Sequence, residues 1–146
     1  GVDGLPVISY YDSTNVALKV AHCTDVACSS AVLTTVAASA VGSTSITIGA
    51  DGLPVISYLE SYYSCGDPAL CPQRSYRLAV AHCGDVSCSS AFVTGVDSSA
   101  EIVGDYSSIT IGADGLPVIS YYDQVNDTLK VAHCSNAFCT PWVRRR

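Results

Sequence analysis

The sequence has few charged residues and no long apolar run, and these two absences exclude several classes of protein. Of its 146 residues, 14% are charged, 49% are hydrophobic and none is methionine. A disordered chain has more charge and fewer apolar residues, so we expect a folded protein with a core. The most apolar stretch, 31–41, is interrupted by threonine and serine, whereas a membrane-spanning helix needs roughly 20 apolar residues. We therefore predict no membrane span.

Basic residues are also scarce, at 7 against 13 acidic ones, which gives a net charge of −6. A nucleic-acid surface needs clustered lysine and arginine to neutralise phosphates. Most of the basic residues lie at Arg74, Arg77 and 144–146, and these form no basic stripe. We predict no nucleic-acid partner.

Cysteine, by contrast, is abundant, with 8 residues that fall into close pairs. Three pairs have the spacing Cys-x4-Cys directly after a Val-Ala-His segment, which is typical of short disulfide loops. A metal site is the alternative, since a histidine precedes each of these pairs. However, neighbouring strand residues point to opposite faces, and the spacing differs from the Cys-x2-Cys of zinc ribbons. The disulfides that we expect are Cys23–Cys28, Cys65–Cys71, Cys83–Cys88 and Cys134–Cys139.

Disulfides predict an oxidising compartment, so we expect an extracellular or cell-surface protein. The sequence begins at Gly1 without an initiator methionine or a signal peptide, which predicts a mature or trimmed product.

An internal repeat indicates the architecture. The segment Gly-Val-Asp-Gly-Leu-Pro-Val-Ile-Ser-Tyr at 1–10 recurs at 49–58 and 112–121 with Ala in place of Val. Each copy is followed by a Leu-x-Val-Ala-His-Cys run, and the alternation of apolar and polar residues has a period of two. Asp-Gly between two such runs predicts a hairpin, and no window has a helical stripe with caps. Four antiparallel strands in about 48 residues are typical of a β-propeller blade.

We therefore predict an all-β chain, with 1–146 forming a single repeat domain of about three four-stranded antiparallel blades. The expected blades are 1–42, 43–104 with an insertion at 61–75, and 105–146. The first blade lacks its first strand, so three blades cannot close into the usual ring of 4–8. Open edges favour pairing with copies of the chain, as a closed ring of two copies or as a filament, unless the chain is a fragment of a larger propeller.

The run Ile-Gly-Ala-Asp-Gly-Leu-Pro-Val-Ile-Ser-Tyr-Tyr-Asp, followed by Leu-Lys-Val-Ala-His-Cys, resembles the blades of secreted bacterial proteins with sialidase-like, Asp-box-type β-propellers. This resemblance covers nearly the whole chain and implies blade topology. The Asp-box pattern Ser-x-Asp-x-Gly-x-Thr-Trp is absent, and Trp142 does not lie in one. Sialidase chemistry needs an arginine cluster, and the only internal arginines are Arg74 and Arg77. A sialidase-like glycosidase is therefore the less favoured alternative to a protein without enzymatic activity.

Other catalytic signatures are also missing, including Gly-x-Ser-x-Gly, His-Glu-x-x-His and a phosphate-binding glycine loop. His22, His82 and His133 are the obvious candidates, but each occupies the same position of its repeat. Such repetition favours a structural role, so we predict no catalytic residue, no metal and no cofactor.

The insertion at 61–75 interrupts the repeat, and long stapled loops on a repetitive scaffold often carry function. The alternative is a surface insertion without a function. Outside the insertion, the pairs Tyr10–Tyr11 and Tyr121–Tyr122 are expected to pack on one face or, alternatively, to stack on sugars. The candidate ligand-binding residues are Tyr62, Tyr63, Arg74 and Tyr76. Asn126 begins an Asn-Asp-Thr sequence, which is a glycosylation acceptor motif.

Two functions follow from these observations. The first is a non-enzymatic, extracellular structural protein that self-associates head to tail, as an oligomer or filament, through its incomplete blades. The alternative is a glycan- or protein-binding propeller module on a secreted or surface protein.

Overall fold

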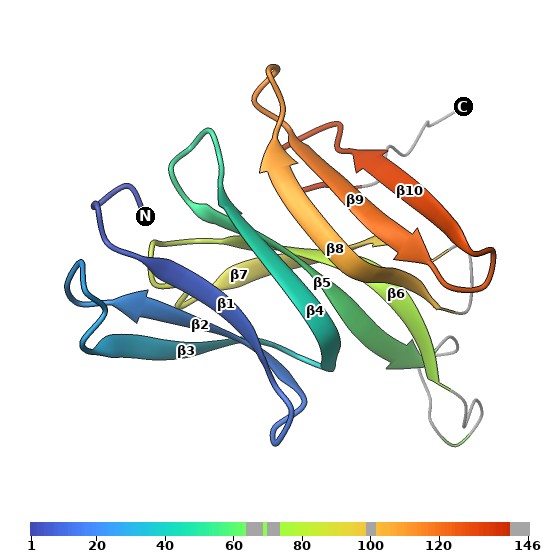
Figure 1. Ribbon diagram of the computed structural model, residues 1–146, viewed down its shortest axis with the longest axis horizontal. Helices are drawn as coiled ribbons and strands as arrows, with labels where there is room; N and C mark the ends of the chain where they lie inside the picture. Colours follow the sequence, from blue (N-terminus) through green and yellow to red (C-terminus); the bar gives the residue numbers. More distant parts are fainter. Residues whose placement is uncertain (64–68, 70–73, 99–101, 141–146) are drawn as a thin grey trace.

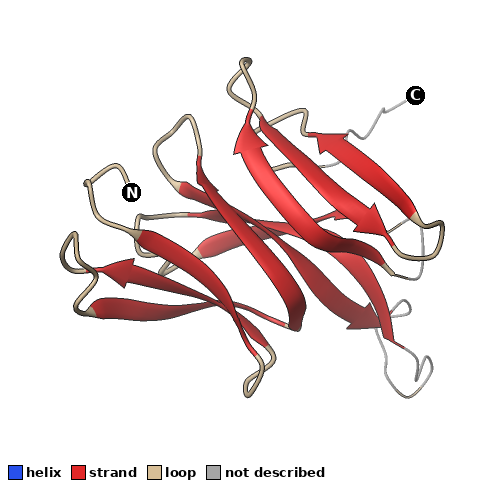
Figure 2. Cartoon of the chain, viewed as in Figure 1, coloured by secondary structure: helices blue, strands red, loops and turns tan. Residues whose placement is uncertain are grey.

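The computed structural model describes residues 1–63, 69, 74–98 and 102–140, and these residues form strands, turns and loops without a helix (Figures 1 and 2). The prediction of an all-β chain is confirmed. The strands are β1 (Val7–Asp12), β2 (Ala17–Cys23), β3 (Ala31–Ala38), β4 (Ala40–Ile48), β5 (Pro54–Tyr63), β6 (Arg74–Cys83), β7 (Ala91–Asp97), β8 (Val103–Ile111), β9 (Pro117–Asp123) and β10 (Thr128–His133).

The strands form three antiparallel sheets, one for each repeat. The first sheet has the order β1-β2-β3, the middle sheet β4-β5-β6-β7 and the third sheet β8-β9-β10. The repeated Val-Ile-Ser-Tyr segment lies in β1, β5 and β9. In the part of the chain that the structure describes, only the middle sheet has four strands. The last residues of the third expected blade, 141–146, lie outside the described residues, so its expected fourth strand is not described.

The change from one sheet to the next occurs earlier than the repeats suggest. β4 begins at Ala40 and β8 at Val103, so the boundaries expected at 42/43 and 104/105 lie inside strands. Only the second half of β4 shows the alternation of polar and apolar residues that marks a strand in the sequence. Its first residues, Ala-Val-Gly, do not alternate, and both alanine and glycine are depleted in strands.

Aspartates shape the hairpin turns that lead into β5 and β9 and the equivalent turn before β1. Each accepts a hydrogen bond at Oδ1 from the backbone N–H two residues further on, at 3.0–3.1 Å, which is the pattern of an Asx turn. The following glycine has a positive φ of 80–84°, a conformation that favours residues without Cβ. The three turns are centred on Asp3-Gly4, Asp51-Gly52 and Asp114-Gly115.

Side chains along a strand alternate between the two faces of a sheet. Because the sequence repeats, the same residues recur on equivalent faces of the three sheets. We call one the Leu-Val-His face, after the apolar residues and the histidine of its Leu-x-Val-x-His strand. We call the other the Ile-Tyr face, after the isoleucine and tyrosine of the Val-Ile-Ser-Tyr segment. The Leu-Val-His residues are Leu18, Val20 and His22, then Leu78, Val80 and His82, then Leu129, Val131 and His133. The Ile-Tyr residues are Ile8 and Tyr10, then Ile56 and Tyr58, then Ile119 and Tyr121.

The core consists of two apolar clusters, one between each pair of neighbouring sheets. In both clusters, the Leu-Val-His face of one sheet packs on the Ile-Tyr face of the next. The middle sheet is therefore covered on both sides. β4 lies between β1 and β8, and the three strands run side by side (Figure 1).

Candidate functional site

The three histidines lie near one end of the sheets, where each contacts the aspartate of its own Asp-Gly turn. Nε2 of the histidine is 2.7–3.0 Å from Oδ2 of the aspartate. The pairs are His22–Asp3, His82–Asp51 and His133–Asp114. The sequence indicated the turns and the structural role of the histidines, but we did not predict that these residues pair. Their joint recurrence in each repeat was the available signal.

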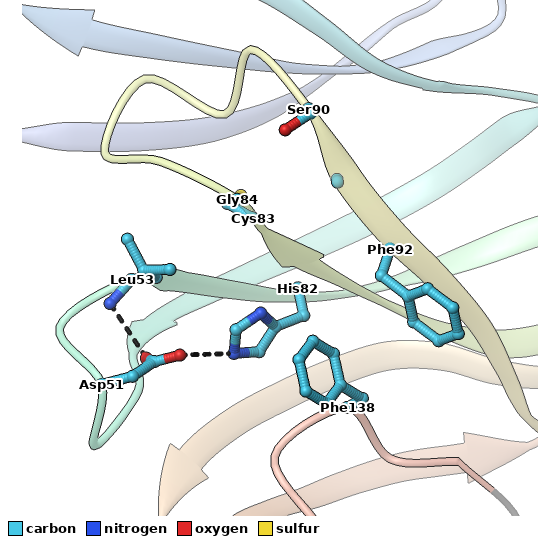
Figure 3. Close-up of a pocket in the computed structure, with 9 residues that line it drawn as sticks. Asp51, Leu53, His82, Cys83, Gly84, Ser90, Phe92 and Phe138 are labelled. Atoms are coloured by element: carbon cyan, nitrogen blue, oxygen red, sulfur yellow. Dashed lines mark hydrogen bonds and ion pairs between the residues drawn. The ribbon is translucent and has the colours of Figure 1, made fainter.

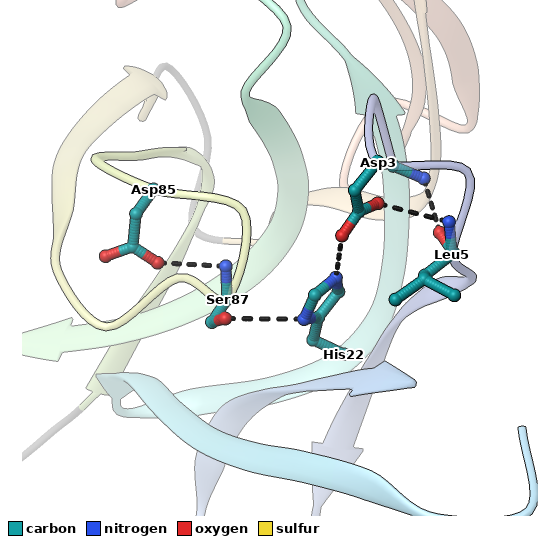
Figure 4. Close-up of polar contacts among 6 residues, drawn as sticks. Asp3, Leu5, His22, Asp85 and Ser87 are labelled. Carbon is teal, nitrogen blue, oxygen red and sulfur yellow. Dashed lines mark hydrogen bonds and ion pairs between the residues drawn. The ribbon is translucent and has the colours of Figure 1, made fainter. Parts of the chain in front are cut away.

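A second contact reaches two of these histidines from the following repeat. Ser87 Oγ lies 3.3 Å from Nδ1 of His22, on the side of the ring opposite Asp3 (Figure 4). The Phe138 ring lies 4.4 Å, centroid to centroid, from His82 (Figure 3). Ser87 and Phe138 occupy equivalent positions, directly before the second cysteine of a Cys-x4-Cys loop. The Cys83–Cys88 and Cys134–Cys139 loops therefore rest on the histidine of the preceding sheet.

The Cys-x4-Cys loops that make these contacts are closed by disulfides. The structure contains Cys23–Cys28, Cys83–Cys88 and Cys134–Cys139, and the described residues include no free cysteine. The expected Cys65–Cys71 pair lies outside the described residues.

Each loop also contains an Asx turn. Asp25 Oδ1 accepts hydrogen bonds from the backbone N–H of Ala27 and Ser29, and Asp85 and Asn136 do the same in their loops. The Ser29 and Ser89 hydroxyls donate to the carboxylates of Asp25 and Asp85 and hold their pKa below the usual range.

The neighbourhood of His82 contains a pocket of about 330 Å³ between the middle and third sheets. Asp51 and His82 lie on one side of it, and Phe92 and Phe138 form an apolar wall (Figure 3). The two phenylalanine rings meet edge to face at 5.6 Å. The His82–Asp51 contact of 3.0 Å is within ion-pair range, but it lacks the alignment of a hydrogen bond. Among the described residues that line the pocket, Asp51 and His82 are the titratable ones, and the same pair recurs in the other two sheets.

The four candidate ligand-binding residues lie at the opposite end of the middle sheet, on two different faces. Tyr63 is paired with Arg74 across β5 and β6, and Ser61 with Tyr76, so Tyr63, Arg74 and Tyr76 share one face. Tyr62 points to the other face. This separation follows from β5 extending to Tyr63, because neighbouring strand residues alternate.

Arginines lie over two of the three candidate tyrosines, Tyr62 and Tyr63. Arg77 lies 4.9 Å from the centre of the Tyr62 ring and binds Glu60 at 2.6 Å. Arg74 lies 5.5 Å from the Tyr63 ring. One face of each ring is thus engaged in a cation–π contact within the chain. Tyr76 instead lines a groove of about 280 Å³ with Leu59, Val41, Ile102, Asp105 and Gln124.

The glycosylation motif lies in the exposed turn between β9 and β10. Nδ2 of Asn126 donates to Oδ2 of Asp123 at 2.9 Å, and Asn15 makes the equivalent contact to Asp12 at 2.7 Å. The hydrogen bonds from Asn126 hold the pKa of Asp123 below its usual range. This turn contact accounts for the asparagine in both repeats.

Comparison with protein-family models, with curated sequences and with solved structures found no match for this chain. Nowhere in the described ranges do three histidine, cysteine, aspartate or glutamate side chains gather as metal ligands. A helix long and apolar enough to cross a membrane is likewise absent from the described residues.

Proposed function

We propose that this chain is a non-enzymatic, extracellular structural protein of the β-propeller repeat type, whose copies associate head to tail. Its three sheets are the blades of this proposal, in line with the resemblance to sialidase-like, Asp-box-type propellers of secreted bacterial proteins. The three disulfides support an oxidising compartment outside the cell.

One observation carries the proposal, namely the exposure of the Leu-Val-His face in the third sheet. Leu129, Val131 and His133 are 76%, 63% and 56% exposed. Their equivalents in the other sheets are buried, apart from the half-buried His22. The residues are identical, so the difference lies in their surroundings. Among the described residues no sheet covers this face, and β10 is an edge strand, whereas β2 and β6 are flanked by β3 and β7.

This exposure is costly for a monomer. Burying a leucine or valine side chain contributes roughly 1.5–3 kcal/mol, and contiguous exposed apolar surface marks an interaction site. Association with a surface like those that cover the first and middle sheets would recover that free energy.

The absence of enzymatic activity is supported by what the histidines already do. In each repeat the imidazole contacts the aspartate of its own hairpin turn. A residue that makes the same contact in three different surroundings is best explained by a role in the repeat itself.

Sedimentation velocity of the full chain over a wide concentration range tests the proposal. We expect species of at least twice the 15.2 kDa chain mass, either a discrete two-copy ring or larger filaments. A stable monomer at every concentration contradicts the proposal.

The alternative, a glycan- or protein-binding module, is favoured by the groove beside Tyr76. There Tyr76 and Leu59 offer apolar surface, and Asp105 and Gln124 offer hydrogen-bonding groups. Titration with a panel of oligosaccharides tests it, with Tyr76→Ala as the variant and Tyr106→Ala, at an exposed tyrosine that does not line the groove, as the control. Binding that is lost only in Tyr76→Ala supports the alternative, and no binding by the parent chain contradicts a glycan site.

A further inference from the structure

We infer that the exposed Leu-Val-His face of the third sheet binds the Ile-Tyr face of the first sheet in a second copy of this chain. In this contact the Cys23–Cys28 loop of the second copy rests on His133. The inference rests on the head-to-tail association proposed above and specifies which surfaces meet.

The interfaces between the first and middle sheets and between the middle and third sheets show which faces pack together. Leu18 and Val20 of the first sheet pack in one cluster with Ile56 and Tyr58 of the middle sheet. The second cluster repeats the arrangement with the next pair of sheets. Its matching residues are Leu78, Val80, Ile119 and Tyr121. A Leu-Val-His face is therefore covered by the Ile-Tyr face of the following repeat on both occasions.

The first sheet has the matching free surface. Ile8 is 47% exposed, although its equivalents Ile56 and Ile119 are fully buried. Leu33, which lies beside Ala21 and Ile8 on the same face, is 63% exposed. The two uncovered faces of the chain are thus the two different halves of its own internal interface. A contact between unlike halves is heterologous, so it forms a ring or a filament.

The Cys-x4-Cys loops show the same complementarity. Cys88 and Cys139 are buried where their loops rest on the preceding sheet, whereas Cys28 is half-buried. In the Cys23–Cys28 loop, Val26 is 79% exposed and Ala27 is exposed as well. Ala27 occupies the position of Ser87 and Phe138, which contact His22 and His82. By equivalence, Ala27 of a second copy lies on His133.

The Ile-Tyr face of the first sheet carries a lysine and an aspartate that bind each other, so docking buries them as a pair. Lys19 binds Asp12 at 2.8 Å on the Ile-Tyr face of the first sheet. The equivalent Lys130 lies 2.6 Å from Asp97 and 3.6 Å from Asp123 within the interface between the middle and third sheets. The internal interface therefore already accommodates a lysine and carboxylates at these positions.

The test uses one blocking variant for each face, in the full chain. Val131→Glu places a charge on the Leu-Val-His face of the third sheet, and Leu33→Glu places one on the Ile-Tyr face of the first. The matched controls are Val125→Glu and Val32→Glu, at residues that are similarly exposed but lie in the β9–β10 turn and on the opposite face of β3. We expect each blocking variant to weaken association at least tenfold by sedimentation equilibrium, and the controls to change it less than threefold. Circular dichroism verifies that all four variants are folded.

Mixing the two blocking variants identifies the contact as heterologous. Each variant keeps one of the two docking faces intact. We therefore expect an equimolar mixture to form heterodimers at a concentration where neither variant associates alone. A contact between two like faces predicts no such recovery.

Cross-linking gives a second readout that does not depend on affinity. A short thiol-reactive cross-linker should join Ala27→Cys chains to His133→Cys chains in a mixture, and should join neither variant to itself.

The outcomes separate this inference from the proposed function. If the parent chain never associates, both fail. If it associates, but Val131→Glu and Leu33→Glu leave its affinity unchanged and no cross-link forms, the docking inference is wrong and head-to-tail association through another surface remains.

Discussion

Equivalent tyrosines have different surroundings in the middle and third sheets. The Tyr58 hydroxyl is fully buried and has no hydrogen-bond partner among the described residues, whereas Tyr121 donates to Asp97 at 2.7 Å. Burial raises the pKa of both phenols, and the Asp97 carboxylate raises that of Tyr121 further.

We expect Tyr58→Phe to raise the free energy of unfolding by about 1 kcal/mol, because it removes an unpaired polar group. Tyr121→Phe should lower it by about 1 kcal/mol, because it removes a hydrogen bond to a carboxylate. Urea unfolding at a fixed protein concentration measures both. Equal destabilisation by the two substitutions would show that Tyr58 has a partner.

Carboxylates with a lowered pKa predict loss of stability in acid. Asp25, Asp85 and Asp123 all have a pKa below the usual 3.8. A lowered pKa means that the folded state favours the ionised carboxylate. Each carboxylate therefore contributes to the free energy of unfolding above about pH 4, and this contribution disappears as the pH falls through the folded-state pKa.

Asp123→Asn should therefore be less stable than the parent chain at pH 7 and should lose less stability between pH 5 and pH 2.5. Thermal unfolding monitored by circular dichroism across this range compares the two slopes. Identical slopes would mean that Asp123 does not contribute to the acid sensitivity.

Close approach between two strands limits which residues β8 accepts. Gly104 has a φ of 110°, and an added Cβ would lie 2.6 Å from Cα of Leu78 in β6. Gly42, in β4, has its nearest neighbour at 3.4 Å, a side-chain atom of Leu59. Gly104→Ala should therefore push the third sheet away from the middle sheet, while Gly42→Ala should be tolerated.

The expected cost of Gly104→Ala is about 2 kcal/mol, in the range typical of overpacking, and that of Gly42→Ala is a small fraction of this. Chemical denaturation gives both values. A Gly104→Ala variant as stable as Gly42→Ala would show that β8 does not pack this closely on β6.

The Cys-x4-Cys loops lead to a prediction about the whole cysteine set, including the pair outside the described residues. Thiol counting on denatured, unreduced protein should find no free cysteine among the 8 in the sequence. Two or more free thiols would contradict the four-disulfide assignment.

Strand positions were largely predictable from the sequence, and contacts between strands were not. The β-branched and aromatic residues of Val-Ile-Ser-Tyr and the Asp-Gly turns located β5, β9 and their hairpins, because both signals are local. The sequence did not indicate the early start of β4 at Ala40, because Ala-Val-Gly shows no alternation and two of its three residues are depleted in strands. The pairing of His22 with Asp3, and of Ser87 with His22, depends on strand register and on sheet packing, which a single sequence does not specify.

For the molecule as a whole, the distribution of exposed apolar side chains follows from three similar sheets packed in series. Within the described residues, the middle sheet is covered on both faces, and each outer sheet has one face without a covering sheet. The two uncovered faces are complementary because every repeat carries both types of face. The head-to-tail association that we propose therefore needs only the repeat itself and no additional binding motif.

Hydroxyl-radical footprinting of the full chain at increasing concentration tests this association at the side chains involved. We predict that labelling of Leu129 and Val131 falls together with labelling of Ile8 and Leu33 as the concentration rises, while labelling of Val125 stays constant. Unchanged labelling at all four positions, or protection of only one of the two faces, would contradict head-to-tail association through these surfaces.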